Sequence, residues 1–257
     1  MKEKNKIYFV GAGPGDPKLL TIKGKELLER ADVIVYAGSL VSSEVLSYAK
    51  KESLLYDSAK MTLEEIIKVL SESFKEGKCV VRLASGDPSI FGAVDEMNEL
   101  LKKDDVEIEM VPGVSSFLAA ASALTRSLTV PDLAQTIILT RAEGRTKMPD
   151  GEKLEDLAKH GSTLILFLSA VLAKSVQEKL LTAYSPETPI AIVYKASCPD
   201  EKIFHGKLDE LANIMREEKI TMTALIFVGQ FLTAEGHRSK LYDASFSHAF
   251  RRASVPE

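Results

Sequence analysis

The sequence contains little of what most disulfide and metal sites require. Only two cysteines, Cys79 and Cys198, occur in 257 residues, and they lie far apart without a Cys-x-x-Cys pair. A disulfide framework and a zinc site therefore both lack support. No two of the four histidines have the spacing of metal ligands, so we expect each to be a surface or hydrogen-bonded side chain. The sequence predicts no protein-bound metal.

The sequence also lacks a long apolar run and a block of basic residues. Only four apolar residues, 7–10, follow the charged amino terminus, which is too few for a signal peptide or a membrane span. The formal net charge is -4, and no segment has the cation density of a nucleic-acid-binding arm. We therefore expect a cytoplasmic protein that binds neither membranes nor nucleic acid.

Common catalytic motifs are absent as well. There is no Gly-x-Ser-x-Gly nucleophile elbow, no Walker lysine after a glycine-rich turn, and no histidine cluster. An enzyme without these groups works mainly by placing two reactants together. That favours transfer of a group that is already activated on a cofactor.

The stretch from Ile7 to Pro17, IYFVGAGPGDP, is an apolar run that ends in a turn rich in glycine and proline. Its glycines are spaced Gly-x-Gly-x-Gly, and Asp16 stands where a dinucleotide-binding fingerprint has its third glycine. Pro14 also removes a backbone N–H that a phosphate would use. The turn departs from a pyrophosphate loop, and both a plain strand-to-helix turn and a ligand-lining turn stay open.

Apolar runs alternate with helical patterns along the chain, which indicates an α/β fold with right-handed crossovers and a parallel sheet. We predict strands at 7–10, 33–36, 54–56, 79–83, 106–111, 136–140, 163–168, 190–194 and 223–228. We predict helices at 21–30, from a capping box at Thr62 and Glu65 to Gly77, and at 94–102, 117–126, 154–160, 172–181 and 208–217.

Two domains are expected, at residues 1–112 and 113–257, because VPGVSS at 111–116 leads into an unusual helix of small residues. Two Gly-Asp-Pro turns, at 15–17 and 86–88, each follow a predicted buried strand, so we expect them at the same edge of the sheet, facing one crevice. The polar tail from Thr233 is expected to lie over the surface or across a partner subunit.

Three motifs, VGAGPGDPKLLTIKG, LASGDPSIFG and VPGVSS, occur in an order and spacing by which the chain resembles the tetrapyrrole methylases. These enzymes use S-adenosylmethionine to methylate the corrin precursor ring. YAGSLV at 36–41 and the segments 129–146, 193–203 and 238–251 are similar to the branch of the family that methylates carbon 11 of precorrin-4 or cobalt-precorrin-4 in cobalamin biosynthesis. The resemblance covers essentially the whole chain. It implies two α/β domains with the active site in the cleft between them, and a homodimer.

The resemblance also implies site residues. The N-terminal domain would form the trough for the tetrapyrrole, with Pro14 and Asp16 on the substrate side, and the C-terminal domain would complete the cofactor site. The residues expected to bind S-adenosylmethionine are Gly86, Asp87, Ile90, Ser115, Ser116, Phe167, Leu168, Ala196, Thr223 and Ala224.

A methyl sulfonium is itself a strong methyl donor, so the protein must align donor and ring carbon and exclude water. Asp16 and Asp87 are candidates for a base that removes a proton, although an aspartate in such a turn often hydrogen-bonds its own backbone. The substrate class carries several carboxylates, for which Arg141, Arg145 and Lys195 are candidate partners. The alternative is that these three cations are solvated surface charges.

Other functions remain open on the sequence. Within the fold, the chain could methylate another ring carbon, or a translation factor or ribosomal RNA; the RNA substrate calls for a basic patch that this acidic chain does not show. It could also be a corrinoid-binding protein without activity, which would bind the ring but not the donor. A dinucleotide oxidoreductase would have to bind a nicotinamide cofactor. Whether the substrate contains cobalt is not encoded in any motif.

Overall fold

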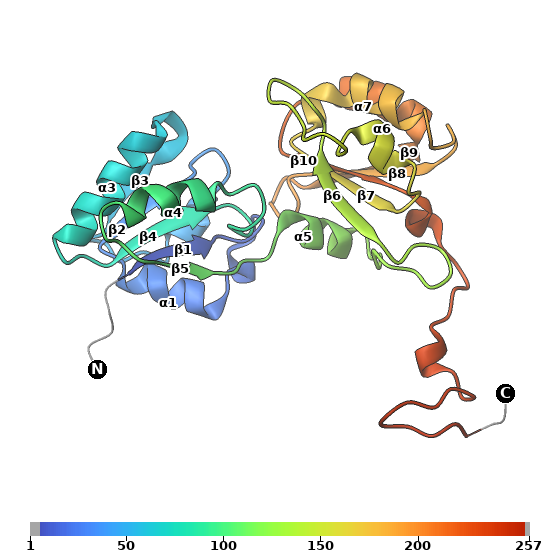
Figure 1. The fold of residues 1–257 in the computed structure, drawn as a ribbon, viewed down its shortest axis with the longest axis horizontal. Helices are drawn as coiled ribbons and strands as arrows, with labels where there is room; N and C mark the ends of the chain where they lie inside the picture. The colour runs from blue at the N-terminus through green and yellow to red at the C-terminus, as the bar shows by residue number, and fades with distance from the viewer. Residues whose placement is uncertain (1–5, 255–257) are drawn as a thin grey trace. The chain divides into compact units, whose positions relative to one another are not determined.

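The computed structural model describes residues 6–254, which divide into two compact units, each built around its own sheet (Figure 1). The first unit extends to Ala123 and also includes Lys195–Glu201, and the second comprises Leu124–Tyr194 and the residues from Lys202. The prediction of an α/β fold is confirmed. The first unit continues beyond residue 112, and the domain boundary expected there stays a prediction.

The sheet of the first unit is parallel throughout. Its strands lie in the order β3-β2-β4-β1-β5. This confirms the parallel sheet that the alternating pattern predicts, and it brings the carboxyl ends of all five strands to one edge. The strands are β1 (Ile7–Gly11), β2 (Val33–Tyr36), β3 (Leu54–Asp57), β4 (Val80–Ala84) and β5 (Ile108–Val111).

Helices cover both faces of this sheet (Figure 1). On one face, Leu70 of α3 and Leu101 of α4 pack with Phe9. On the other face, Leu28 of α1 packs with Val10. Strands that are buried on both faces read as nearly continuous apolar runs, which is why the sequence pattern finds them. The helices of this unit are η1 (Pro17–Leu19), α1 (Ile22–Arg30), α2 (Ser43–Leu46), η2 (Ser58–Lys60), α3 (Leu63–Lys75), α4 (Val94–Lys102) and α5 (Ser116–Ala123).

The capping box predicted at the start of α3 is confirmed. The Thr62 Oγ1 accepts a hydrogen bond from the Glu65 backbone N–H at 3.3 Å, and the Glu65 Oε2 accepts one from the Thr62 N–H at 2.7 Å. The reciprocal pair satisfies backbone donors that a helix leaves free at its first turn. It therefore fixes the residue at which α3 begins.

The second unit has a mixed sheet of order β6-β7-β10-β8-β9. Strands β6 and β7 are parallel, whereas β10 is antiparallel to both of its neighbours and β8 is antiparallel to β9. The amino end of β10 therefore lies at the same edge as the carboxyl ends of β7 and β8. The strands are β6 (Ile137–Arg141), β7 (Thr163–Phe167), β8 (Pro189–Tyr194), β9 (Lys202–Lys207) and β10 (Ala224–Val228).

Strand β9 has no clear signal in the sequence. Its residues, KIFHGK, hold only two large apolar side chains, Ile203 and Phe204, and both are half-buried. It is also an edge strand, paired on one side with β8. An edge strand that buries little need not show the alternation by which strands are recognised.

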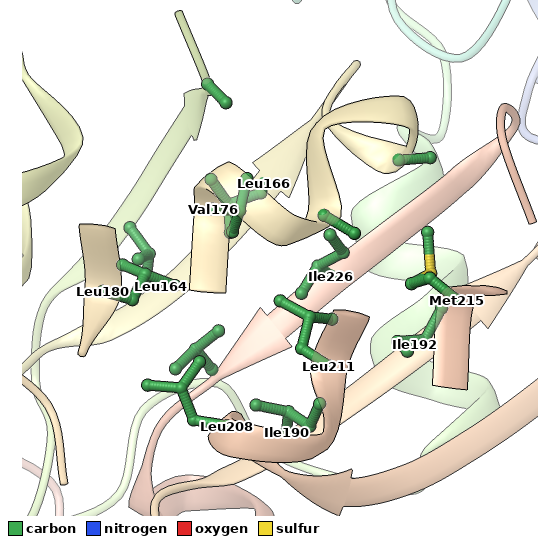
Figure 2. Close-up of a cluster of buried hydrophobic side chains, with 14 of the residues drawn as sticks. Leu164, Leu166, Val176, Leu180, Ile190, Ile192, Leu208, Leu211, Met215 and Ile226 are labelled. Atoms are coloured by element: carbon green, nitrogen blue, oxygen red, sulfur yellow. The ribbon is translucent and has the colours of Figure 1, made fainter. Parts of the chain in front are cut away.

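One face of the second sheet is covered by the helices α6 (Leu154–Ala158), α7 (Ala173–Leu180) and α8 (Leu211–Glu217). Figure 2 shows Leu166, Ile192 and Ile226 of the sheet among Val176 of α7 and Leu211 of α8. These five side chains are fully buried. Such a core holds the strands, and thereby their ends, in fixed positions. Short helical turns follow at η3 (Ala170–Leu172), η4 (Leu208–Glu210), η5 (Gln230–Thr233) and η6 (Lys240–Tyr242).

The tail after η5 leaves aromatic side chains in solvent, with Tyr242 80% and Phe250 96% exposed. Within it, the Arg251 guanidinium donates hydrogen bonds to the carbonyls of Leu241 and Tyr242 at 3.0 and 3.4 Å. The tail therefore forms a locally ordered turn. Its contact with a partner subunit stays a prediction. Across residues 6–254, every helix is too short or too polar to cross a bilayer.

Candidate active site

Two glycine-rich turns of the first unit lie side by side at the carboxyl ends of β1 and β4. The Gly86 N–H donates to the Gly13 carbonyl at 2.8 Å, and the Gly13 N–H donates to the Gly86 carbonyl at 3.2 Å. The expectation that both Gly-Asp-Pro turns lie at one edge of the sheet is confirmed. In parallel α/β sheets this edge is where ligands bind.

A third turn, after β5, packs against the same pair without side chains between them. A Cβ built on Gly113 would lie 2.1 Å from the Gly86 carbonyl oxygen and 2.8 Å from the Gly11 Cα. A Cβ on Gly11 would lie 2.6 Å from the Gly113 Cα. These distances are far shorter than any van der Waals contact, so only glycine permits the three backbones to approach.

Asp87 ties two of these turns together. Its Oδ2 accepts a hydrogen bond from the Gly113 N–H at 2.8 Å, and its Oδ1 accepts one from the Ser89 N–H at 2.8 Å and another from the Ser89 hydroxyl. Partial burial raises the pKa of the Asp87 carboxyl, but the hydrogen bonds from Ser89 and Gly113 outweigh it and leave the pKa below its usual value. A carboxylate so stabilised is a weak base, and these contacts favour the turn-holding role over proton removal.

We expect Asp87→Asn to lower the free energy of unfolding by about 1–2 kcal/mol at neutral pH, because one charge-assisted hydrogen bond is lost. Since the folded-state pKa lies below the unfolded value, the carboxylate stabilises the fold above about pH 4, and this stabilisation is lost as the pH falls through the folded-state pKa. Urea unfolding, measured at intervals from pH 7 to pH 3, should show that the difference in the free energy of unfolding between the wild type and Asp87→Asn becomes smaller as the pH falls. Asp105→Asn, at an exposed aspartate with a left-handed backbone, is the matched control. If the difference in the free energy of unfolding between the wild type and Asp87→Asn does not change with pH, the stabilising role of the Asp87 carboxylate is wrong.

The other predicted aspartate, Asp16, caps the short helix η1. Its Oδ1 accepts from the Lys18 N–H at 2.8 Å, and its own N–H donates to the Ser197 hydroxyl at 3.1 Å. The segment Lys195–Glu201 thus packs on the first turn. A Cβ on Gly15 would lie 3.2 Å from the Ala196 carbonyl oxygen. Pro14 and Ala196 are both buried here, so the predicted residues Pro14, Asp16 and Ala196 are brought together.

Three further predicted residues lie on the turns beside Gly86. The Ile90 N–H donates to the Asp87 carbonyl at 3.2 Å, within the turn that follows β4. Ser115 is buried and lies opposite Gly86, since a Cβ on Gly86 would be 3.6 Å from the Ser115 Cα. Ser116 begins α5. The structure therefore brings Gly86, Asp87, Ile90, Ser115 and Ser116 together at one edge.

The predicted residues of the second unit also share one edge of their sheet. Arg141 pairs with Phe167 at the carboxyl ends of β6 and β7. Ala224 pairs with Tyr194, so the amino end of β10 lies beside the carboxyl end of β8. Residues far apart in the sequence thus converge because β10 runs antiparallel to its neighbours.

Three of these strand ends hold a non-glycine residue with a left-handed backbone. The φ angles are 52° at Leu168 after β7, 48° at Lys195 after β8, and 55° at Thr223 before β10. Such conformations cost about 1–3 kcal/mol each for non-glycine residues and cluster at ligand sites. The Leu168 side chain is also 67% exposed. Both features are typical of a binding edge.

The predicted cations differ in what they contact. The Arg141 guanidinium donates to the carbonyls of Thr146 and Lys147 at 3.1 and 2.9 Å, and so holds the loop after β6. Arg145 on that loop is exposed. The Lys195 ammonium forms an ion pair with Asp200 at 2.5 Å. A role for any of them in binding substrate carboxylates stays a prediction.

Ser169 is a residue of this edge that no sequence pattern identifies. It is fully buried, accepts a hydrogen bond from the Ala142 N–H at 2.8 Å and donates one to the Phe167 carbonyl at 2.6 Å. One hydroxyl therefore links the loops after β6 and β7. A lone serine after a strand carries no signal in a sequence, because the link depends on a partner far along the chain.

Across residues 6–254, no three histidine, cysteine, aspartate or glutamate side chains are grouped so that they could hold a metal ion. Instead of metal ligands, the edges of the two sheets carry closely packed backbone, small residues and a few exposed apolar or charged side chains. This chemistry suits a small organic ligand that is recognised largely through its shape and by backbone groups.

Glycine-packed turns at the strand ends of the first sheet and left-handed residues at the strand ends of the second are features typical of α/β proteins that bind small molecules. Residues 6–212 match the family of Tetrapyrrole (Corrin/Porphyrin) Methylases. The chain belongs to this family.

Curated relatives match over nearly the whole length. The chain is 50% identical over 255 residues to the cobalt-precorrin-4 C(11)-methyltransferase of Methanocaldococcus jannaschii, covering 98% of both proteins. It is 41% identical over 246 residues to the precorrin-4 C(11)-methyltransferase of Pseudomonas aeruginosa, covering 95% of this chain and 98% of that one.

Solved structures agree with these relatives. The X-ray structure of a cobalt precorrin-4 methyltransferase, a cobalamin biosynthetic enzyme, matches with a TM-score of 0.86 at 49% identity, over 88% of this chain and 95% of that one. The uroporphyrin-III C-methyl transferase of Thermus thermophilus, solved with S-adenosylhomocysteine, matches with a TM-score of 0.74 at 32% identity, over 89% of this chain and 99% of that one.

Proposed function

We propose that the protein transfers a methyl group from S-adenosylmethionine to carbon 11 of precorrin-4 or of its cobalt complex, a step of cobalamin biosynthesis. The observation that carries this proposal is the similarity over the whole chain to relatives named for methylation at carbon 11, at 50% and 41% identity. Similarity that spans both units includes both predicted binding edges, not just the glycine-rich turns that a whole superfamily can share.

The residues present fit S-adenosylmethionine as a donor. When bound, it supplies an electrophilic methyl group, so the chain needs to bind, orient and keep out water rather than activate the methyl. The turns at Gly86 and Ser115 offer backbone groups close together, and the exposed Leu168 side chain offers an apolar surface. We propose that the ten residues predicted for the cofactor, from Gly86 to Ala224, contribute to binding it.

For the substrate, we propose that Pro14 and Asp16 line its side of the first turn. The exposed Arg145 is the cation best placed to meet a carboxylate directly, because Arg141 is engaged with loop carbonyls and Lys195 with Asp200. Arg141 and Lys195 are proposed to hold their own loops in position and to contribute positive charge. Asp16, half-buried on the same turn, is the remaining candidate for a base.

The test is methyl transfer without oxygen, using S-adenosylmethionine with a ¹³C-labelled methyl group and either precorrin-4 or cobalt-precorrin-4. We expect NMR to place the label on carbon 11 of the product. The form of substrate that turns over faster decides whether cobalt is present in the natural substrate. The relatives carry both names, so each result is compatible with the family.

Other outcomes would replace the proposal. Label at a different ring carbon would make the protein a methylase of different regiochemistry. Ring binding without any binding of S-adenosylhomocysteine, measured by calorimetry, would indicate a corrinoid-binding protein without activity. Donor binding with no transfer to either macrocycle would remove the corrin substrate and leave the family assignment intact.

We further propose that the protein is a homodimer and acts in the cytoplasm. The exposed aromatic side chains of the tail, Tyr242 and Phe250, support a second chain as their partner, because large apolar side chains in solvent often mark an interface. Sedimentation equilibrium would show a single species of twice the chain mass. Cell fractionation would place the activity in the soluble fraction.

A further inference from the structure

A hollow in the second unit lies away from that unit's own residues proposed for methyl transfer. It has a volume of about 820 Å³ and is lined by the loop 125–135 before β6 and by residues 231–240 after β10. Strand β6 starts at Ile137 and β10 ends at Val228, so this hollow lies at the opposite edge of the sheet from Arg141 and Ala224. Five residues of strand separate the two edges by roughly 16 Å.

The lining of this hollow is rich in cations. Arg126 comes from one segment, and Arg238 and Lys240 come from the other, more than a hundred residues later. The Arg126 Nη1 donates to the Ala234 carbonyl at 3.2 Å and so ties the two segments together. Three cations converge in this way on one hollow of a chain whose net charge is -4. This convergence distinguishes them from charges scattered over a surface.

Neutral hydrogen-bonding groups also line the hollow. Thr125, Ser127, Thr129 and Ser239 contribute hydroxyl groups, and Gln135 contributes an amide. Hydroxyl and amide groups beside arginine and lysine are the partners that phosphate and carboxylate oxygens take in proteins. The hollow therefore offers both charge and directional hydrogen bonds to an anion.

Two carboxylates limit the positive charge. Asp132 lines the hollow, and Asp243 lies close enough to Arg238 for that arginine to contribute to the lowering of its pKa, after the larger effect of hydrogen bonds from Ser245. Asp132 has a left-handed backbone with φ of 59°, as has Thr125 with φ of 52°. The ligand must then carry more than one negative charge to gain from all three cations.

We propose that this hollow binds a small polyanion, a molecule with clustered phosphates or carboxylates, at Arg126, Arg238 and Lys240. Within the second unit, the site is separate from the residues proposed for methyl transfer, and it does not depend on that proposal. Its size exceeds that of a single phosphate and is in the range of drug-sized ligand sites.

Isothermal titration of the full-length protein at 0.15 M NaCl, with inorganic tripolyphosphate and with propane-1,2,3-tricarboxylate, tests the proposal. We expect saturable 1:1 binding of at least one probe, and the tighter probe shows whether phosphate or carboxylate is the preferred group. The double variant R238Q/K240Q should weaken binding about tenfold or more, since charge-assisted hydrogen bonds are lost. K174Q, at an exposed lysine of α7, should leave the dissociation constant unchanged.

A variant that is expected to bind the probe more tightly provides a second test. Asp132→Asn removes the opposing charge and keeps a side chain that tolerates the left-handed backbone, so it should tighten binding about threefold. Hydrogen exchange should slow in residues 125–132 and 234–240 when the probe is bound. Absence of saturable binding of both probes would overturn the proposal, as would equal dissociation constants for the wild type and R238Q/K240Q.

Discussion

Gly113→Ala is expected to lower the free energy of unfolding by about 3 kcal/mol, because the added methyl group has no space and its neighbours cannot move aside cheaply. The Cβ would lie 2.1 Å from the Gly86 carbonyl oxygen and 2.8 Å from the Gly11 Cα, and both are backbone atoms. Relief of the clash must separate the turns after β1, β4 and β5. Urea unfolding monitored by circular dichroism measures the loss.

The same variant should lose methyl transfer by about a hundredfold, since displacement of a positioning element by about 1 Å can cost that much. Gly86 and Ser115 are proposed to bind the donor, and the displaced Gly113 backbone also loses its hydrogen bond to Asp87, now 2.8 Å long. The activity of the folded fraction, taken with the dissociation constant for S-adenosylhomocysteine, separates this effect from unfolding.

Two glycine controls separate crowding from backbone conformation. Gly77 has φ of 79° and nothing within 4 Å of a built Cβ, so Gly77→Ala should cost about 1 kcal/mol and leave activity intact. At Gly144 the Cβ would meet only the Leu172 Cδ1, at 3.2 Å, and Gly144→Ala should change stability by less than about 0.5 kcal/mol. If Gly113→Ala behaves like Gly77→Ala, the close packing of the three turns is wrong. Gly11→Ala, with a Cβ at 2.6 Å from Gly113, is an independent repeat.

The first sheet was predictable because its chemistry is local and strong. Buried strands such as Val33–Tyr36 are continuous apolar runs, and the Thr62 to Glu65 capping box marks a helix start within four residues. Parallel pairing follows from the alternation of strands and helices. The order β3-β2-β4-β1-β5 does not follow from such local signals, because it is set by which surfaces pack together across the whole unit.

The second sheet has features that local sequence patterns do not predict. The antiparallel placement of β10 between β7 and β8, and the edge strand β9, depend on pairings between distant segments. The small insertion Lys195–Glu201 looks like an ordinary loop between strands. It packs against the turn at Gly15 and Asp16 in the first unit, and residue spacing in the sequence does not predict this tertiary contact.

The candidate site, like the fold, could be predicted from the sequence only in part. Motifs with glycine and aspartate at fixed spacing locate the turns at Gly13 and Gly86, and the structure shows in addition that these turns pair with each other. The family resemblance implies which residues bind the donor, and these expected residues lie at the ends of strands in both sheets and on the segment Lys195–Glu201. The contacts that hold those edges, such as the Ser169 hydroxyl between two loops, involve single polar residues with no pattern around them.

Ser169→Ala is the second change for which we expect a large effect. The hydroxyl is fully buried, and its removal deletes the hydrogen bond that it accepts from the Ala142 N–H and the one that it donates to the Phe167 carbonyl. A buried polar group that loses its hydrogen bond costs about 1–3 kcal/mol, so the free energy of unfolding should fall by about 2–3 kcal/mol. Chemical denaturation at neutral pH measures this change.

The same substitution should weaken donor binding, because Phe167 is proposed to contact S-adenosylmethionine and its carbonyl would lose the hydrogen bond from the Ser169 hydroxyl. We expect the dissociation constant for S-adenosylhomocysteine to rise about tenfold. Ser185→Ala removes an exposed hydroxyl that accepts one hydrogen bond, from the Glu187 N–H at 3.3 Å, and should change stability by less than about 0.5 kcal/mol.

Ser169→Cys distinguishes the lost hydrogen bonds from a lost side-chain volume. A thiol fills the space but is a weak donor and a weak acceptor, so this variant should fall between the wild type and Ser169→Ala in stability and in donor affinity. If Ser169→Ala lowers stability while the dissociation constant stays at the wild-type value, Ser169 supports the fold of the second unit alone. In that case the carboxyl end of β7 does not need a fixed Phe167 carbonyl to bind the donor, and the proposed role of Phe167 would have to be withdrawn.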